Sequence, residues 1–111
     1  MTAYELLRSA MEPLVPACVP GDYDGESQEY CVFHVDVQPN AFADGLPSAL
    51  TCAVVMDWYL PRGINPIAKR NEICLALETA GFTYPVVTDG SDSLTQRYIF
   101  EFELPEGILR G

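Results

Sequence analysis

The first residues of the chain carry apolar side chains at helical spacing. Thr2-Ala3-Tyr4-Glu5 has the form of a capping box, in which Thr2 and Glu5 satisfy free amides at the start of a helix. The apolar positions at this spacing are Ala3, Leu6, Leu7, Ala10 and Leu14. Proline has no amide hydrogen to donate and disfavours helical geometry in the residue before it. We therefore expect a helix that is stopped by Pro13 and Pro16, then a loop or irregular edge over residues 15–28.

Two segments in the middle of the chain alternate between two sets of residues, which is typical of half-buried strands. In residues 30–37 the apolar set is Cys31, Phe33, Val35 and Val37. In residues 50–60 it is Cys52, Val54, Met56, Trp58 and Leu60. Residues 38–48 contain two prolines and an Asp-Gly pair and have no hydrophobic period. The sequence predicts a long loop there, of the kind that more often carries function than core.

A second helix is predicted from Pro66 to about Ala80. Asn65 can cap it, and proline suits the first helical position because its missing N–H costs nothing there. The expected apolar side comprises Ile67, Ile73, Cys74, Leu77 and Ala80. Gly81 can adopt the positive φ that ends many helices. Arg70 projects from the apolar side, where it either lays its stem on the core or forms an ion pair at a subunit interface.

Two further strands complete the predicted order α-β-β-α-β-β. The first covers residues 84–88, a turn follows over residues 89–92, and a long last strand covers residues 94–104. In the last strand we expect Tyr98, Phe100, Phe102 and Leu104 to face inward and Arg97, Ile99, Glu101 and Glu103 to face outward. Strands joined by loops and turns favour antiparallel pairing. The sequence therefore predicts one α+β domain over residues 1–111, a two-layer sandwich with a mainly antiparallel four-stranded sheet and both helices packed on one face.

Composition limits the classes of partner that the protein is expected to bind and the compartment in which it is expected to act. The 111 residues include 16 Asp and Glu against 6 Lys and Arg, which gives a formal net charge of −10 and a pI near 4.2. That balance disfavours binding to nucleic-acid phosphates or anionic lipid. No run approaches the roughly 18 apolar residues of a membrane-spanning helix, and the N-terminus lacks the order of a signal peptide. We therefore expect the protein to be made and used inside a cell.

The sequence offers little catalytic chemistry. His34 is the only imidazole, with Asp36 on the same strand face, and no spacing pairs it with a cysteine. Glu101 and Glu103 lie on one strand face, and such a pair is more often a solvated face or an electrostatic lining than a hydrolase dyad. Residues 22–26 contain acidic side chains but lack the ligand spacing of a calcium loop. The cysteines have no zinc-site spacing and are expected to be buried thiols: Cys18, Cys31, Cys52 and Cys74. We therefore expect no catalytic residue, no metal, no cofactor and a non-enzymatic role.

One further pattern runs through the second half of the chain. It comprises Tyr59-Leu60-Pro61-Arg62-Gly63-Ile64-Asn65-Pro66, Lys69-Arg70, Leu77, Ala80-Gly81-Phe82-Thr83-Tyr84-Pro85, Asp89-Gly90-Ser91-Asp92 and Gln96-Arg97-Tyr98-Ile99-Phe100-Glu101-Phe102-Glu103. With its size, element order and acidity, the chain resembles tail terminator (tail completion) proteins, encoded in the head-to-tail joining region of siphophages and prophages. The likeness covers residues 57–103 well and the N-terminal half mainly by element order.

The resemblance implies a structural virion protein of the tail, assembled in the bacterial cytoplasm. Such proteins form a ring, commonly a hexamer, that caps the tail-tube protein, ends its polymerisation and contacts the head-completion or connector protein. Six copies would carry a formal charge on the order of −60, so DNA would pass through the lumen without binding. The channel-lining residues we expect are Asp22, Asp24, Glu26 and Asp44. The subunit-interface residues we expect are Arg62, Lys69, Arg70, Tyr59 and Ile99, the last two because outward aromatic and apolar side chains suggest cover by another subunit.

The residues themselves are also compatible with other functions. One is an acidic intracellular inhibitor or adaptor that binds a basic partner, although the carboxylates are scattered rather than arranged in one stripe. Another is a small enzyme, which would require a pocket around a perturbed His34 or Cys31. Among phage proteins, a neighbouring head-tail connector subunit is an alternative to the terminator, because both roles use small acidic α+β subunits.

Overall fold

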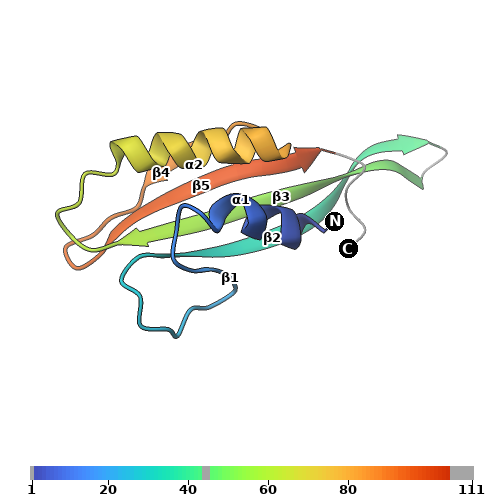
Figure 1. Ribbon diagram of the computed structural model, residues 1–111. Coiled ribbons are helices and arrows are strands. Elements are labelled where there is room, and N and C mark those ends of the chain that lie inside the picture. The colour runs from blue at the N-terminus through green and yellow to red at the C-terminus, as the bar shows by residue number, and fades with distance from the viewer. Residues whose placement is uncertain (1, 44–45, 106–111) are drawn as a thin grey trace.

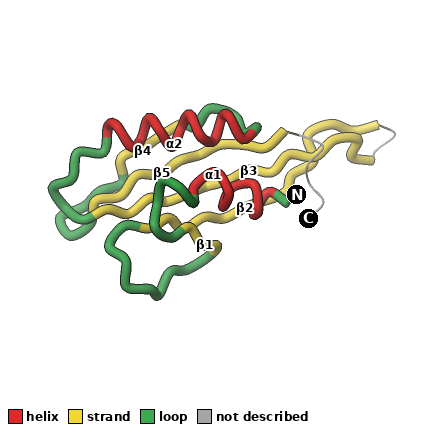
Figure 2. Tube along the Cα trace, in the orientation of Figure 1, coloured by secondary structure: helices red, strands yellow, loops and turns green. Residues whose placement is uncertain are grey.

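The computed structural model describes residues 2–43 and 46–105 and confirms the α+β class (Figure 1). Its elements are α1 (Ala3–Met11), β1 (Cys18–Pro20), β2 (Tyr30–Ala43), β3 (Leu46–Leu60), α2 (Ile67–Ala80), β4 (Val86–Asp89) and β5 (Gln96–Pro105). The two helices contact each other and lie on the same face of one sheet, as predicted (Figure 2). The other face of the sheet carries no described helix.

The sheet has five strands in the order β1-β2-β3-β5-β4, rather than the four that were expected. The additional strand is β1, which pairs in parallel with β2, whereas the other three pairs are antiparallel. It forms within residues expected to be a loop or irregular edge. The amide of Cys31 donates to the carbonyl oxygen of Ala17 at 2.8 Å, and the amide of Gly21 donates to the carbonyl oxygen of Phe33 at 3.1 Å. These long-range bonds create a strand too short to have a hydrophobic period.

β2 and β3 form one long hairpin. The expectation of a loop over residues 38–48 is wrong, because pairing continues from Gln38 and Thr51 to Ala43 and Leu46. The strand register shifts next to Pro39 and Ala41, as it does at β-bulges. These shifts interrupt the alternation of apolar and polar residues by which a strand is recognised in a sequence.

The outer part of this hairpin extends beyond the rest of the sheet. Pairing between β3 and β5 ends at Thr51 and Pro105. Within the described chain, residues 39–43 and 46–50 therefore pair only with each other, and we call them the arm. The arm lies at one end of an elongated molecule whose principal extents are 53 × 25 × 24 Å (Figure 1).

The core lies between the sheet and the helices. The alternating residues of β3 and β5 face it as predicted, and all are buried: Cys52, Val54, Met56, Trp58, Leu60, Tyr98, Phe100, Phe102 and Leu104. The helices contribute Ala3, Leu7, Met11, Ile73, Cys74 and Leu77. Val37 and Ile67 were expected on the apolar faces but are 50% and 54% exposed. Val37 lies next to the arm and Ile67 is the first residue of α2, so neither is enclosed between the layers.

Both helices begin and end close to the predicted residues. Thr2 caps α1, and its Oγ1 accepts a hydrogen bond from the amide of Glu5 at 3.0 Å. α2 begins one residue later than predicted, where Oδ1 of Asn65 accepts from the amide of Ile67 at 3.1 Å. Gly81 follows α2 with φ of 110°, a left-handed conformation that glycine adopts without steric cost.

The strands that follow α2 both begin two residues later than predicted. Pro85 is buried before β4, and the turn between β4 and β5 extends through Thr95. Oδ1 of Asp92 accepts hydrogen bonds from the amides of Leu94 at 2.8 Å and Thr95 at 2.7 Å. Because these amides bond to a side chain, they are not available to a strand ladder, and β5 begins at Gln96.

Candidate functional site

The sheet face opposite the helices is the strongest candidate surface. Strand register places Tyr30, Tyr59 and Arg97 in one row across β2, β3 and β5. The next rows hold Val32, Asp57 and Ile99, then His34, Val55 and Glu101. We call these residues, together with Tyr23 from the loop before β2, the outer face. Tyr59 and Ile99 lie here as the sequence predicts, each half-buried.

Three tyrosines form a continuous stack on the outer face. The ring centroids of Tyr23 and Tyr30 are 4.4 Å apart, and those of Tyr30 and Tyr59 are 4.8 Å apart, with interplanar angles of 25° and 20°. The guanidinium of Arg97 lies 5.9 Å from the centre of the Tyr59 ring, within cation–π range. The hydroxyl of Tyr23 accepts a hydrogen bond from the amide of Ser27 at 2.9 Å. The stack therefore holds the loop before β2 against the sheet.

Asp57 and Arg97 form an ion pair within the outer face, with 3.6 Å between Oδ1 and Nε. Their side chains are 18% and 38% exposed. Both atoms are buried and have no hydrogen-bond partner in the described chain. Burial raises the pKa of the neighbouring Tyr59, and the Asp57 carboxylate adds to that rise. Buried polar atoms without a hydrogen bond are costly, so a group that reached these atoms from outside and hydrogen-bonded to them would gain affinity.

The outer face and the loop before β2 surround a hollow of about 290 Å³. It is lined by Gly21, Asp22, Tyr23, Tyr30, Val32, His34, Asp57 and Tyr59. His34 and Asp36 lie on the same strand face, as predicted, and His34 also lines the hollow together with Asp57 of the next strand.

Three of the four predicted channel residues lie among the described residues, and all three are in the loop before β2. Asp22, Asp24 and Glu26 are exposed, and Asp22 reaches the hollow of the outer face. Asp44 lies outside the described residues. Glu101 and Glu103 are also exposed, on the outer side of β5. Acidic side chains therefore gather on the loop and on the helix-free side of the sheet.

Two of the predicted interface cations have partners within the same chain. Nζ of Lys69 donates to the two carboxylate oxygens of Glu29, at 3.1 and 3.3 Å. Arg62 donates to the backbone carbonyl of Asp92. Arg70 is half-buried on α2 and forms no ion pair within the described chain. Their contacts with another subunit stay a prediction, and Arg97, which sequence reasoning did not select as an interface cation, is the cation of the outer face.

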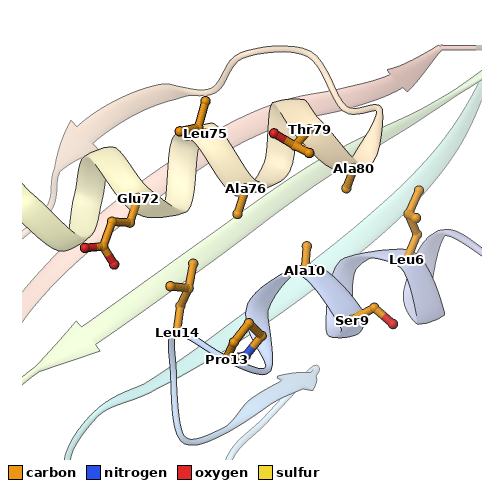
Figure 3. Close-up of a pocket in the computed structure, with 10 residues that line it drawn as sticks. All are labelled: Leu6, Ser9, Ala10, Pro13, Leu14, Glu72, Leu75, Ala76, Thr79 and Ala80. Atoms are coloured by element: carbon orange, nitrogen blue, oxygen red, sulfur yellow. The ribbon is translucent and has the colours of Figure 1, made fainter.

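A second surface feature is an apolar groove between the two helices (Figure 3). It measures about 530 Å³ and is lined by Leu6, Ser9, Ala10, Pro13, Leu14, Glu72, Leu75, Ala76, Thr79 and Ala80. Leu75 is 61% exposed. Leu6, Ala10 and Leu14 were expected within the apolar side of the first helix, and the groove leaves them only partly buried.

The described residues hold no group of three or more side chains suited to a metal ion. No helix in the described ranges is long and apolar enough to cross a membrane. Cys31, Cys52 and Cys74 are buried as expected, whereas Cys18 is only partly buried.

No model of a protein family matches the chain, and no similar sequence was found among curated proteins.

Proposed function

We propose that this protein is a structural subunit of the virion of a long-tailed phage, a tail terminator that forms a ring at the head-proximal end of the tail tube. In this role it ends tube polymerisation and joins the tail to the head-completion or connector protein. The observation that supports this proposal most strongly is the unsupported arm, since a hairpin that pairs only with itself in the described chain would be stabilised by contact with a partner.

A two-stranded hairpin without a third strand or a covering layer is marginally stable in water. The arm pairs only with itself in the described chain, so it leaves backbone donors and acceptors along both outer edges. In a cyclic assembly, the arm of one subunit can lie on the body of the next, which is a head-to-tail contact. Such contacts produce a ring when the rotation closes, and we propose a hexamer.

Charge supports a ring through which DNA moves. The chain carries a formal charge of −10, and its exposed carboxylates include Asp22, Asp24 and Glu26. A lumen lined by such residues repels phosphates, so the genome would pass without specific binding. The outer face supplies the aromatic and apolar contact area that a neighbouring subunit needs, with Tyr59 and Ile99 within it.

The experiment combines this protein with the tail-tube protein of the same phage genome. Tube lengths are measured by negative-stain microscopy with and without the full chain. Short tubes with a distinct ring at one end support the terminator. Unchanged tube lengths overturn it, and binding to the connector alone would favour a neighbouring connector subunit.

A matched control lacks only the arm. Residues 39–50 are replaced by Asn-Gly, so that a two-residue turn joins Gln38 to Thr51, which already pair with each other. We expect this variant to keep a folded α+β circular dichroism spectrum with less strand signal than the full chain, and to lose its effect on tube length. A variant that still shortens tubes would show that the arm does not carry the function.

A further inference from the structure

Cys18 and Cys31 are direct partners in the parallel pairing of β1 with β2. Neighbouring strands lie about 4.8 Å apart, and disulfides join Cα atoms separated by roughly 4.4–6.8 Å. Because they are paired directly, their side chains lie on the same face of the sheet. The pair is therefore placed for a covalent bond, although it is reduced in this structure.

The two thiols have different surroundings. Cys31 is fully buried, whereas Cys18 is partly buried and lines a hollow of about 380 Å³ beside Arg8. The neighbouring Cys31 thiol lowers the pKa of Cys18, and the Arg8 guanidinium lowers it further. The same contact with Cys18, together with burial, raises the pKa of Cys31. Cys18 is therefore the thiol that ionises first and that a small reagent can reach.

We propose that Cys18 and Cys31 form a redox-active dithiol that closes to a reversible disulfide by exchange with a small disulfide such as oxidised glutathione. The Cys18 thiolate attacks one glutathione sulfur, forms a mixed disulfide and releases one glutathione thiolate. The Cys31 thiol then loses its proton and attacks the Cys18 sulfur, releasing the second glutathione. In sum, two protein thiols are oxidised and one glutathione disulfide is reduced to two glutathione thiols.

The disulfide would tie β1, a three-residue strand at the sheet edge, to the long β2 strand. This site is independent of the proposed virion function and requires no second subunit. The chain contains its own controls, because Cys52 lies on β3 and Cys74 on α2. Both are buried, and the pKa of each is raised, in both cases mainly by burial.

The test treats the folded full chain with excess oxidised glutathione, quenches with N-ethylmaleimide in denaturant, and measures intact mass followed by peptide mapping. The expected product has lost two hydrogens, carries two alkyl groups, and contains one disulfide between Cys18 and Cys31. Reduction with dithiothreitol should restore four alkylation sites. Failure of the wild-type chain to form this disulfide, or equal reaction at Cys52 or Cys74, overturns the proposal.

Variants separate the two steps. Cys31→Ser should stop at a stable glutathione adduct on Cys18, because no resolving thiol remains. Cys18→Ser should lose the reaction, whereas Cys52→Ser should react like the wild-type chain. If Cys31→Ser does not fold, as judged by circular dichroism, Cys31→Ala is used in its place. A glutathione adduct that accumulates on Cys18 while Cys31 is present would contradict the resolving step.

Discussion

The indole Nε1 of Trp58 donates a hydrogen bond of 3.1 Å to Oε2 of Glu29, a residue 29 positions earlier in the chain. The same carboxylate oxygen accepts from Nζ of Lys69 at 3.1 Å. Trp58 is fully buried, so Glu29 supplies the acceptor that its N–H requires. This contact joins the end of the loop before β2 to β3 and α2.

Replacement of Glu29 by alanine should destabilise the fold by about 1–3 kcal/mol, because a buried donor loses its acceptor. Glu29→Gln should retain much of the stability, since its carbonyl oxygen can still accept from Trp58. The measurement is urea unfolding followed by fluorescence of Trp58, the only tryptophan. Equal free energies of unfolding for Glu29→Ala and the wild-type chain would contradict the role assigned to this bond.

Substitution of two leucines of α2 tests which face of this helix packs against the sheet. Leu77 is fully buried, whereas Leu75 is 61% exposed in the groove between the helices. Leu77→Ala should cost about 2–5 kcal/mol, because it removes buried methyl groups and leaves a cavity. Leu75→Ala should change stability by no more than about 0.5 kcal/mol. Similar losses for both, measured by urea unfolding, would show that α2 packs through a different face.

Acid should weaken the turn before β5. Hydrogen bonds from the amides of Leu94 and Thr95 hold the pKa of Asp92 below its usual value of 3.8. The unfolded chain therefore binds the proton at higher pH than the folded chain, and this contribution to stability is lost as pH falls below that value. Asp92→Asn keeps the acceptor oxygen but does not titrate, so its melting temperature should fall less steeply with acid.

The control for that comparison is Asp24→Asn, which removes the same charge from an exposed loop position. Melting temperatures are measured from neutral pH to about pH 3. The Asp24→Asn profile should follow the wild-type profile. An Asp92→Asn profile that also follows the wild type would show that the turn does not contribute to acid sensitivity.

Salt should strengthen self-association. Each copy of the chain is strongly acidic, and the positive charges of Lys69 and Arg97 are already paired with carboxylates of the same chain. In the proposed ring, repulsion between neighbouring copies should dominate, and salt screens it over about 10 Å at 0.1 M. Sedimentation velocity at low and high salt should show more assembly at high salt. Assembly that weakens with salt would indicate attractive ion pairs across the interface, with Arg70 the first candidate.

The elements that the sequence predicts well are those whose signal is local. Residues 52–60 and 98–104 alternate with a period of two, and one apolar set in each becomes the buried face. The capping box at Thr2 and Glu5 and the glycine at residue 81 also act within one or two turns of a helix. These signals are sufficient to predict both helices and the central strands.

The remaining features depend on partners distant in the sequence. β1 exists because residues 18–20 meet β2, and the arm exists because residues 39–43 meet residues 46–50 across bulges. Asp57 meets Arg97 only through the register of β3 with β5, although the outward position of Arg97 was predictable. The tyrosine stack likewise needs a loop to fold back on the sheet. The outward positions in the strands were predictable, but their neighbours were not.

We propose that the chain assembles into a closed ring. The most direct measurement is light scattering coupled to size-exclusion chromatography across protein concentration, followed by negative-stain microscopy of the largest species. We predict a discrete oligomer, a hexamer, with a central hole. A strict monomer at every concentration and salt, with no ring in the presence of tail-tube protein, would contradict ring assembly.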